Sequence, residues 1–179
     1  ALYIGLAFSL RPDDFLRPDS GSDHKVCAMQ FAFWFPTHYV LLCDTQQFPP
    51  YPVRPTRMSL LPDYDKANRE GQAVMRACAG NPNLTEPCFI QYLFEFFRRY
   101  PPLSPSSALF SALPPHIDLY MCINSLLKHT APLLGLNPNQ LLPKGLRAAA
   151  TGYSDTFGRT DADAKLTSGW RSDAQDVYK

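Results

Sequence analysis

The C-terminal stretch of the chain, residues 141–179, reads LLPKGLRAAATGYSDTFGRTDADAKLTSGWRSDAQDVYK. Basic and aromatic side chains recur in it at informative spacing: Lys144-Gly-Leu-Arg147, then Gly169-Trp170, then Tyr178. Pro143 predicts the start of a short helix, because proline favours the first helical position. Thr160 predicts the start of a second helix, and Ser172-Asp-Ala-Gln175 matches a capping box that starts a third. We therefore expect three short helices, with Tyr178 in the second turn of the last one.

The start of the chain predicts two helices that meet at a basic residue. Residues 1–10 (ALYIGLAFSL) are apolar almost all round, which indicates a buried helix. Pro12 suits the first position of the next helix, and Asp13 and Asp14 suit its first turn. Arg11 is then held at the corner between the helices. On local features alone, a surface ion pair between Arg11 and Asp14 is the alternative to a functional role.

The middle of the chain begins with strand candidates. Residues 27–35 and 38–43 are rich in aromatic and β-branched residues, and residues 46–55 form a proline-rich irregular connection. Residues 56–64 and 72–78 predict two further strands around the hairpin tip DKANREG at 65–71. Lys66 enters that tip. A lysine there is commonly only a solubilising charge.

Helices follow the strands. A helix is expected from Thr85 to Tyr100, with a core stripe that is a packing surface and not a platform for stacked bases: Phe89, Leu93, Phe96, Phe97 and Tyr100. Residues 115–132 predict a second long helix, closed by Gly135, with its inward side chains at Leu119, Ile123, Leu126 and Leu127. The expected fold class is α+β, mainly α-helical, with a small antiparallel sheet and hairpin on one side.

Composition narrows the class of protein. A length of 179 residues, with 45% hydrophobic and 18% charged residues, predicts one globular domain over residues 1–179. No apolar run is long enough for a membrane span, and the N-terminus lacks a signal-peptide pattern. Five cysteines without a C-x-x-C pair indicate reduced thiols, hence nucleus, cytoplasm or nucleoid, and the four histidines show no metal-ligand spacing. A net charge of +1 means that any basic surface must be local.

These residues together resemble the catalytic domain of tyrosine recombinases and phage-type integrases, over nearly the whole chain and in order. In that family an arginine at the end of an apolar helix is followed three residues later by an acid, which matches Arg11-Pro-Asp-Asp14. A lysine on a β-hairpin comes next and matches Lys66. A helix and a short segment before Leu109-Phe110 complete the early half.

The late half of the resemblance lies in the C-terminal stretch. The second family box is usually His-x-Leu-Arg before small residues, and here it is Lys144-Gly-Leu-Arg147-Ala-Ala-Ala-Thr. Gly-His or Gly-Trp follows, here Gly169-Trp170, and the nucleophile follows that, here Tyr178. The run from Trp170 through Arg-Ser-Asp-Ala resembles the integrases of mobile elements. The resemblance also implies an integrase-like fold from which an N-terminal core-binding domain and a C-terminal helix are missing.

The resemblance implies transesterification of a DNA phosphodiester. Tyr178 would attack the phosphorus and form a 3′-phosphotyrosine, with neither metal nor ATP nor another cofactor. Arg11 and Arg147 would clamp the non-bridging oxygens, because a guanidinium offers two donors in a fixed fork. Asp14 would orient Arg11 or a neighbouring group. The implied partners are double-stranded DNA and further copies of the protein, as a tetramer on paired sites.

The other implied roles concern proton transfer and charge. Trp170 would donate its indole N–H to a phosphate oxygen, since an indole cannot act as a base. Lys66 would be the general acid for the leaving 5′-oxygen. Lys144 stands where the family most often has histidine, and would serve as a second donor or proton carrier.

Alternatives remain open at each position and for the whole chain. Trp170 and Tyr178 taken singly are typical packing or surface residues, and Arg147 could be an ion-pair partner. The whole protein could be a catalytically inactive DNA-binding remnant or domesticated relative of an integrase. A protein-interaction domain without a role on DNA is the third alternative.

Overall fold

A computed structural model of the chain describes residues 4–5, 8, 10, 12–16, 26–61, 74–77, 89–139 and 143–145. The chain separates into two compact units. One consists of Ala1–Lys25 with Pro114–Lys179, and the other is Val26–Leu113. The single domain over residues 1–179 stays a prediction.

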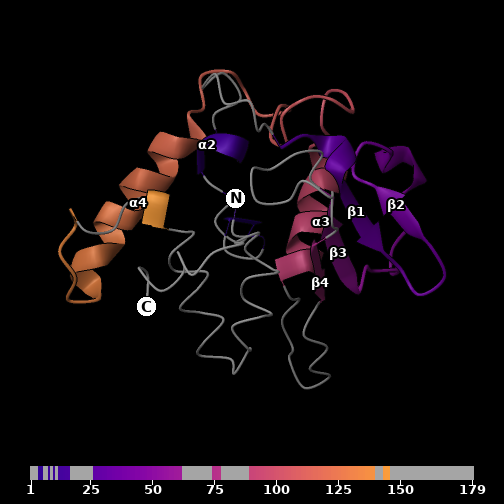
Figure 1. Cartoon of the computed structure of the whole chain (residues 1–179), viewed down its shortest axis with the longest axis horizontal. Helices are drawn as coiled ribbons and strands as arrows, with labels where there is room; N and C mark the ends of the chain where they lie inside the picture. The colour runs from indigo at the N-terminus through magenta and orange to yellow at the C-terminus, as the bar shows by residue number, and fades with distance from the viewer. Residues whose placement is uncertain are drawn as a thin grey trace, which may run out of the picture. The chain divides into compact units, whose positions relative to one another are not determined.

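The second unit is built on a four-stranded antiparallel sheet in the order β2-β1-β3-β4 (Figure 1). The strands are β1 (Phe31–Trp34), β2 (Tyr39–Leu41), β3 (Arg57–Leu60) and β4 (Val74–Ala77). All three pairings are antiparallel. With the helices of the chain, this sheet makes the fold α+β, and the expected small antiparallel sheet is confirmed.

One face of the sheet is aromatic and aliphatic because side chains alternate along each strand. Phe31 lies opposite Leu60 and Phe33 opposite Met58, so these four side chains share a face. All four are buried. Trp34 lies on the other face, where its Nε1–H donates to Ser59 Oγ at 2.8 Å.

The first strand is shorter than residues 27–35 because a turn precedes it. Residues Ala28–Gln30 form the 3-10 helix η1. The Cys27 N–H donates to Gln30 Oε1 at 2.8 Å, so a side chain takes the place of a ladder partner. The ladder therefore begins at Phe31. After β2, residues Thr45–Gln47 form the 3-10 helix η2, and residues 48–56 are an irregular connection as predicted.

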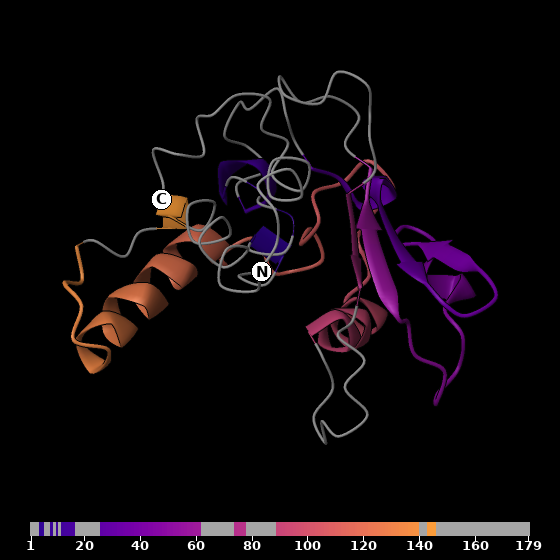
Figure 2. The same cartoon turned by 60° about the horizontal axis from the view of Figure 1, so that its bottom comes forward.

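Helix α3 (Phe89–Arg99) covers the aromatic face of the sheet (Figure 2). The ring of Phe94 lies edge-on to Phe33 at 5.4 Å and to Phe35 at 5.6 Å, and 4.8 Å from Phe48. Aromatic pairs in such arrangements add to the free energy of burial. The predicted helix is confirmed over these residues, whereas its predicted start near Thr85 lies outside the described residues.

The predicted core stripe of α3 is wrong in part. The buried side chains of the helix are Ile90, Leu93, Phe94 and Phe97. Phe89 and Phe96 are only half-buried, and Tyr100 is 50% exposed. The buried face is rotated from the predicted one: Ile90, Phe94 and Phe97, spaced by four and three residues, are fully buried, and Phe94 contacts Phe33 of the sheet.

The segment after α3 returns to the start of β1. Ala108 bridges Cys27, and the Ala28 N–H donates to the Ser107 carbonyl at 3.2 Å. Leu109 is fully buried, and Phe110 stacks on Phe97 at 5.7 Å. The segment after α3, which forms neither helix nor strand in the described residues of this unit, therefore packs against the residues that precede β1.

The first unit begins with helical residues. Ile4, Gly5 and Phe8 are helical and buried, in agreement with the expected buried helix. Helix α2 (Pro12–Phe15) begins at the predicted proline. A 3-10 helix, η3 (Pro143–Gly145), begins at the second predicted proline.

Helix α4 (Leu119–Leu133) starts later than residue 115 because Asp118 is its N-cap. The Asp118 carboxylate accepts from the Met121 N–H at 3.0 Å, which satisfies one backbone donor of the first turn. Ile123 is buried as predicted, whereas Leu126 is 53% exposed and does not face the core. Leu119 and Leu127 are half-buried.

Gly135 ends α4 as predicted. Its φ is +69°, in the left-handed region that glycine enters at little cost. The Gly135 N–H donates to the Pro132 carbonyl at 3.1 Å, and the Leu136 N–H donates to the Ala131 carbonyl at 2.9 Å. These two bonds form a Schellman motif, which satisfies carbonyls of the last turn.

Candidate functional site

Two of the predicted site residues lie on described backbone. Asp14 lies in α2 and Lys144 in η3, both in the first unit. The remaining predicted site residues lie outside the described residues: Arg11, Lys66, Arg147, Trp170 and Tyr178. A single site that combines them stays a prediction.

The described elements around these positions have the predicted type. Pro12 starts α2, so Arg11 directly precedes a helix in the sequence. Pro143 is buried and starts η3, with Lys144 as its second residue.

Lys66 belongs to the segment that joins β3 to β4. These strands are antiparallel neighbours in the sheet, in a register that runs from Arg57 opposite Ala77 to Leu60 opposite Val74. The predicted pairing of the two strands is therefore confirmed, while Lys66 itself stays outside the described residues.

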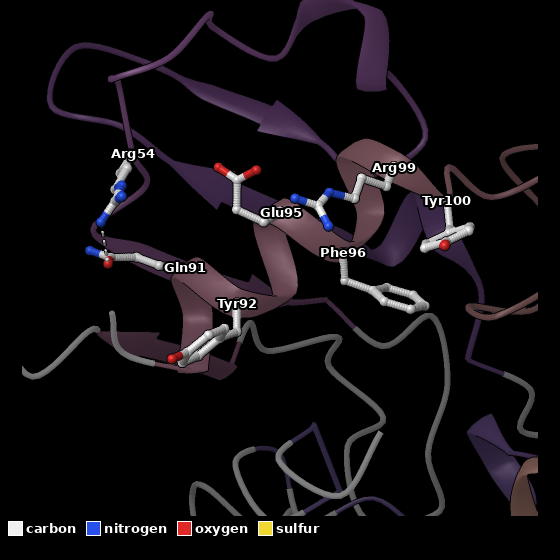
Figure 3. A pocket seen from close by; sticks show the side chains of 7 residues that line it. All are labelled: Arg54, Gln91, Tyr92, Glu95, Phe96, Arg99 and Tyr100. Carbon is white, nitrogen blue, oxygen red and sulfur yellow. Dashed lines mark hydrogen bonds between the residues drawn. The ribbon is translucent and has the colours of Figure 1, made fainter. Parts of the chain in front are cut away.

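In the second unit, described residues line a groove on the outer face of α3 (Figure 3). It has a volume of about 370 Å³. Its lining residues are Arg54, Gln91, Tyr92, Glu95, Phe96, Arg99 and Tyr100. Arg54 comes from the connection between β2 and β3, and the others come from α3 and the residue after it.

The lining of the groove consists of two parallel rows. Gln91, Glu95 and Arg99 recur every fourth residue and form a polar row, because such positions share a helix face. Tyr92, Phe96 and Tyr100 form an aromatic row beside it in the same way. Figure 3 shows the charged ends of Glu95 and Arg99 on one side of the helix and the Tyr92 ring on the other.

Arg54 is oriented at one end of the groove. Its Nη1 donates to Gln91 Oε1 at 3.3 Å (Figure 3), and its guanidinium carbon lies 6.0 Å from the centre of the Tyr51 ring. No side-chain hydrogen bond or ion pair joins Glu95 or Arg99 to another residue in the described part of the chain. Their charged ends are therefore available to a ligand.

The described side chains of the second unit carry more positive than negative charge. The arginines are Arg54, Arg57, Arg98 and Arg99, and the acids are Asp44 and Glu95. Two of the arginines lie in the groove.

The sequence pattern did not predict this groove, because two members of its aromatic row, Phe96 and Tyr100, were assigned to the core stripe. Tyr92 is 55% exposed, and Tyr100 is also exposed, although both belong to a helix with a buried face. The signal was present in the sequence: apolar residues occur at more positions of this helix than one face can hold. The surplus had to face outward.

Among the described cysteines, Cys43 does not have the environment of an activated thiol. Burial, the nearby carboxylate of Asp44 and the thiol of Cys27 raise the pKa of Cys43 above its ordinary value. A raised pKa lowers the thiolate fraction at neutral pH, which is opposite to what a nucleophilic cysteine requires. Cys122 is exposed on α4.

The described residues contain no cluster of histidine, cysteine and acidic side chains that could hold a metal ion. None of the helices formed by these residues has both the length and the apolar character needed to cross a membrane.

Comparison of the chain with protein-family models, with curated proteins and with solved structures finds no match. The assignment of function therefore depends on the residues, their order and their local structure.

Proposed function

We propose that the protein cleaves and rejoins DNA strands through a 3′-phosphotyrosine intermediate, in site-specific recombination or DNA integration. The observation that carries this proposal is the order along the chain of the resembling positions: Arg11, Lys66, Lys144, Arg147, Trp170 and Tyr178. Each of these residue types can perform the step that its place in the order requires. The proposed fold is the integrase-like one, as a finer form of the α+β class.

Different residues act on the nucleophile and on the leaving group of the reaction. The Oη atom of Tyr178 forms a bond to phosphorus, the bond from phosphorus to the 5′-oxygen breaks, and Lys66 gives that oxygen its proton. Lys144 has the role of a second donor or of the carrier of the tyrosine proton. The free energy of the phosphodiester is kept in the phosphotyrosine, so rejoining needs no nucleotide.

Charge on the phosphate is stabilised by fixed donors. Arg11 and Arg147 each supply a guanidinium, and Trp170 supplies an indole N–H. Loss of one preorganised donor of this kind costs on the order of 10²–10³ in rate. Asp14 has the supporting role of orienting Arg11.

Three structural features are compatible with this proposal. Helix α2 begins directly after Arg11, η3 contains Lys144, and the segment with Lys66 joins two neighbouring antiparallel strands.

The experiment is a suicide-substrate assay. The protein is incubated with a library of nicked duplexes of random sequence, labelled so that a covalent 3′-adduct keeps the label after the short 5′-hydroxyl strand has dissociated. We expect a protease-sensitive labelled band on a denaturing gel. Sequencing of the recovered DNA would then give the target.

Matched variants identify the nucleophile. Tyr178→Phe is expected to abolish the adduct, whereas Tyr153→Phe, a tyrosine in the same stretch, keeps it. Arg147→Lys is expected to slow adduct formation, because lysine lacks the two-donor fork. An adduct that survives Tyr178→Phe would refute the proposed mechanism.

The second candidate is an inactive DNA-binding relative, and the replacement of the usual histidine by Lys144 favours it. Binding to duplex DNA at low salt, without an adduct, would support this candidate. Low salt is the sensitive condition because phosphate contacts are strongest there. Absence of both binding and adduct would exclude both candidates.

A further inference from the structure

We propose that the groove on α3 binds an unpaired strand of DNA. The ligand unit is a nucleotide whose base stacks on the aromatic row and whose phosphate lies at an arginine. The residues that line the groove are not among the predicted cleavage residues, and the proposal does not require their chemistry, although the choice of DNA over RNA rests on the proposed function.

The aromatic row offers flat faces to a ligand. Tyr92 and Tyr100 are both at least half-exposed, and Phe96 between them is half-buried against Tyr100 and Phe110. Successive positions are about 6 Å apart along the helix, since four residues rise about 1.5 Å each. Exposed rings at such intervals are the usual platform for unpaired bases, because every base has a π-face. The groove volume of about 370 Å³ is within the range of small-ligand sites.

The arginines give the groove two points for phosphate. Arg54 is at one end, held by Gln91 and by the Tyr51 ring, and Arg99 is toward the other end of α3 (Figure 3). A guanidinium that is already oriented loses less entropy when it binds an anion. Arg54 can bind phosphate with its remaining N–H groups, because a guanidinium has five.

The negative charge of Glu95 disfavours a ligand that is anionic along its whole length. The Glu95 carboxylate lies in the polar row between Gln91 and Arg99, and would repel a run of bare phosphates. A nucleotide avoids this repulsion because its charge is on the phosphate while its base presents N–H donors. Carboxylates accept from such groups, for example from N4 of cytosine. In a duplex these donors are paired and the base faces are covered, so the groove fits an unpaired strand.

The test uses the whole chain and a fluorescein-labelled oligodeoxycytidine, with binding followed by anisotropy between about 50 and 200 mM salt. The double variant Arg54→Ala/Arg99→Ala is expected to reduce the slope of log affinity against log salt by about 1.4, since each lost single-strand phosphate contact removes about 0.7. Arg98→Ala is the control for one of these two charges: it removes a charge next to Arg99 in the sequence but outside the groove, and should leave the slope unchanged.

Ring stacking is tested separately. Tyr92→Ala is expected to weaken binding at least about fivefold, whereas Tyr92→Phe keeps the ring and the affinity. An abasic strand of equal charge should bind at least about fivefold more weakly than the cytidine strand. Thermal melting followed by circular dichroism establishes that every variant is folded. The binding assay does not depend on strand cleavage, so failure of the cleavage proposal leaves this test intact.

Several results would overturn the inference. An Arg98→Ala variant that lowers the salt slope by about 0.7, as loss of one groove arginine would, would show a diffuse charge effect. Equal binding of the abasic strand, or no loss in Tyr92→Ala, would exclude base stacking. A duplex bound as tightly and with the same dependence on Tyr92 would exclude an unpaired strand, and tighter binding of the matching RNA would exclude DNA as the ligand.

Discussion

Replacement of Gly135 by alanine should destabilise the protein without any steric clash. Gly135 has a φ of +69°, and a Cβ atom added there would meet nothing within 4 Å. The cost therefore comes from the backbone alone. A residue with a Cβ loses roughly 1–2 kcal/mol in the left-handed region. Alanine also restricts the unfolded chain, which offsets about 0.4–1 kcal/mol.

The net expectation is a loss of about 1 kcal/mol in the free energy of unfolding. Gly135→Asn should lose less, because asparagine tolerates the left-handed conformation. Gly145→Ala is the matched control, since Gly145 also has open space around it but no left-handed φ. Its expected effect is neutral or stabilising, by up to about 1 kcal/mol.

The assay is urea unfolding followed by far-ultraviolet circular dichroism, with thermal melting in parallel. For a chain of this length, about 1 kcal/mol corresponds to a shift of about 2–4 °C in Tm. The order of stability should be Gly145→Ala, then wild type, then Gly135→Asn, then Gly135→Ala. If Gly135→Ala were as stable as Gly145→Ala, the Schellman ending of α4 would be refuted.

Three further changes test other parts of the structure. Ser59→Ala leaves the Trp34 Nε1–H without its partner on the sheet and should cost about 1–2 kcal/mol in urea unfolding, so a neutral result would contradict that hydrogen bond. Asp118→Ala removes the N-cap of α4 and should cost about 1 kcal/mol, with Asp118→Asn close to wild type because asparagine also caps. Iodoacetamide should alkylate the exposed Cys122 faster than Cys43 at pH 8, as peptide mass spectrometry can measure. Because the pKa of Cys43 is raised, its alkylation rate should still be rising above pH 9. A Cys43 rate that levels off below pH 8 would contradict the raised pKa.

Local signals in the sequence predicted many of the elements. Pro12 and Pro143 mark helix starts, Gly135 marks a helix end, and a charged tip separates the strands that became β3 and β4. These signals work because each depends on the backbone preferences of a few neighbouring residues.

The inward faces of helices were predicted less well. In α3, apolar residues occupy so many positions that periodicity alone allows more than one buried face, and contact with Phe33 and Phe35 selects Phe94. In α4, Leu126 matched the inward pattern but is exposed. Which face is buried depends on what the helix packs against, and that is information from distant parts of the chain.

The groove shows the same limit for a functional surface. Arg54 is separated in sequence from Gln91 by two strands, and no local rule brings them together. Only the packing of α3 on the sheet places the β2–β3 connection at the end of the helix. The predicted cleavage residues are likewise far apart in sequence, so their meeting depends on tertiary structure.

The strand order of the sheet has a consequence for the protein while it is being synthesised. The hairpin of β1 and β2 leaves the ribosome first, with Phe31 and Phe33 on one of its faces. Pairing with β3 needs the chain as far as Leu60, and cover by α3 needs it as far as Arg99. Until then the nascent chain displays an aromatic face and an unpaired strand edge, both of which promote aggregation. A chaperone or slow dilution during refolding should therefore raise the yield of folded protein, and synthesis halted before α3 should give an insoluble product.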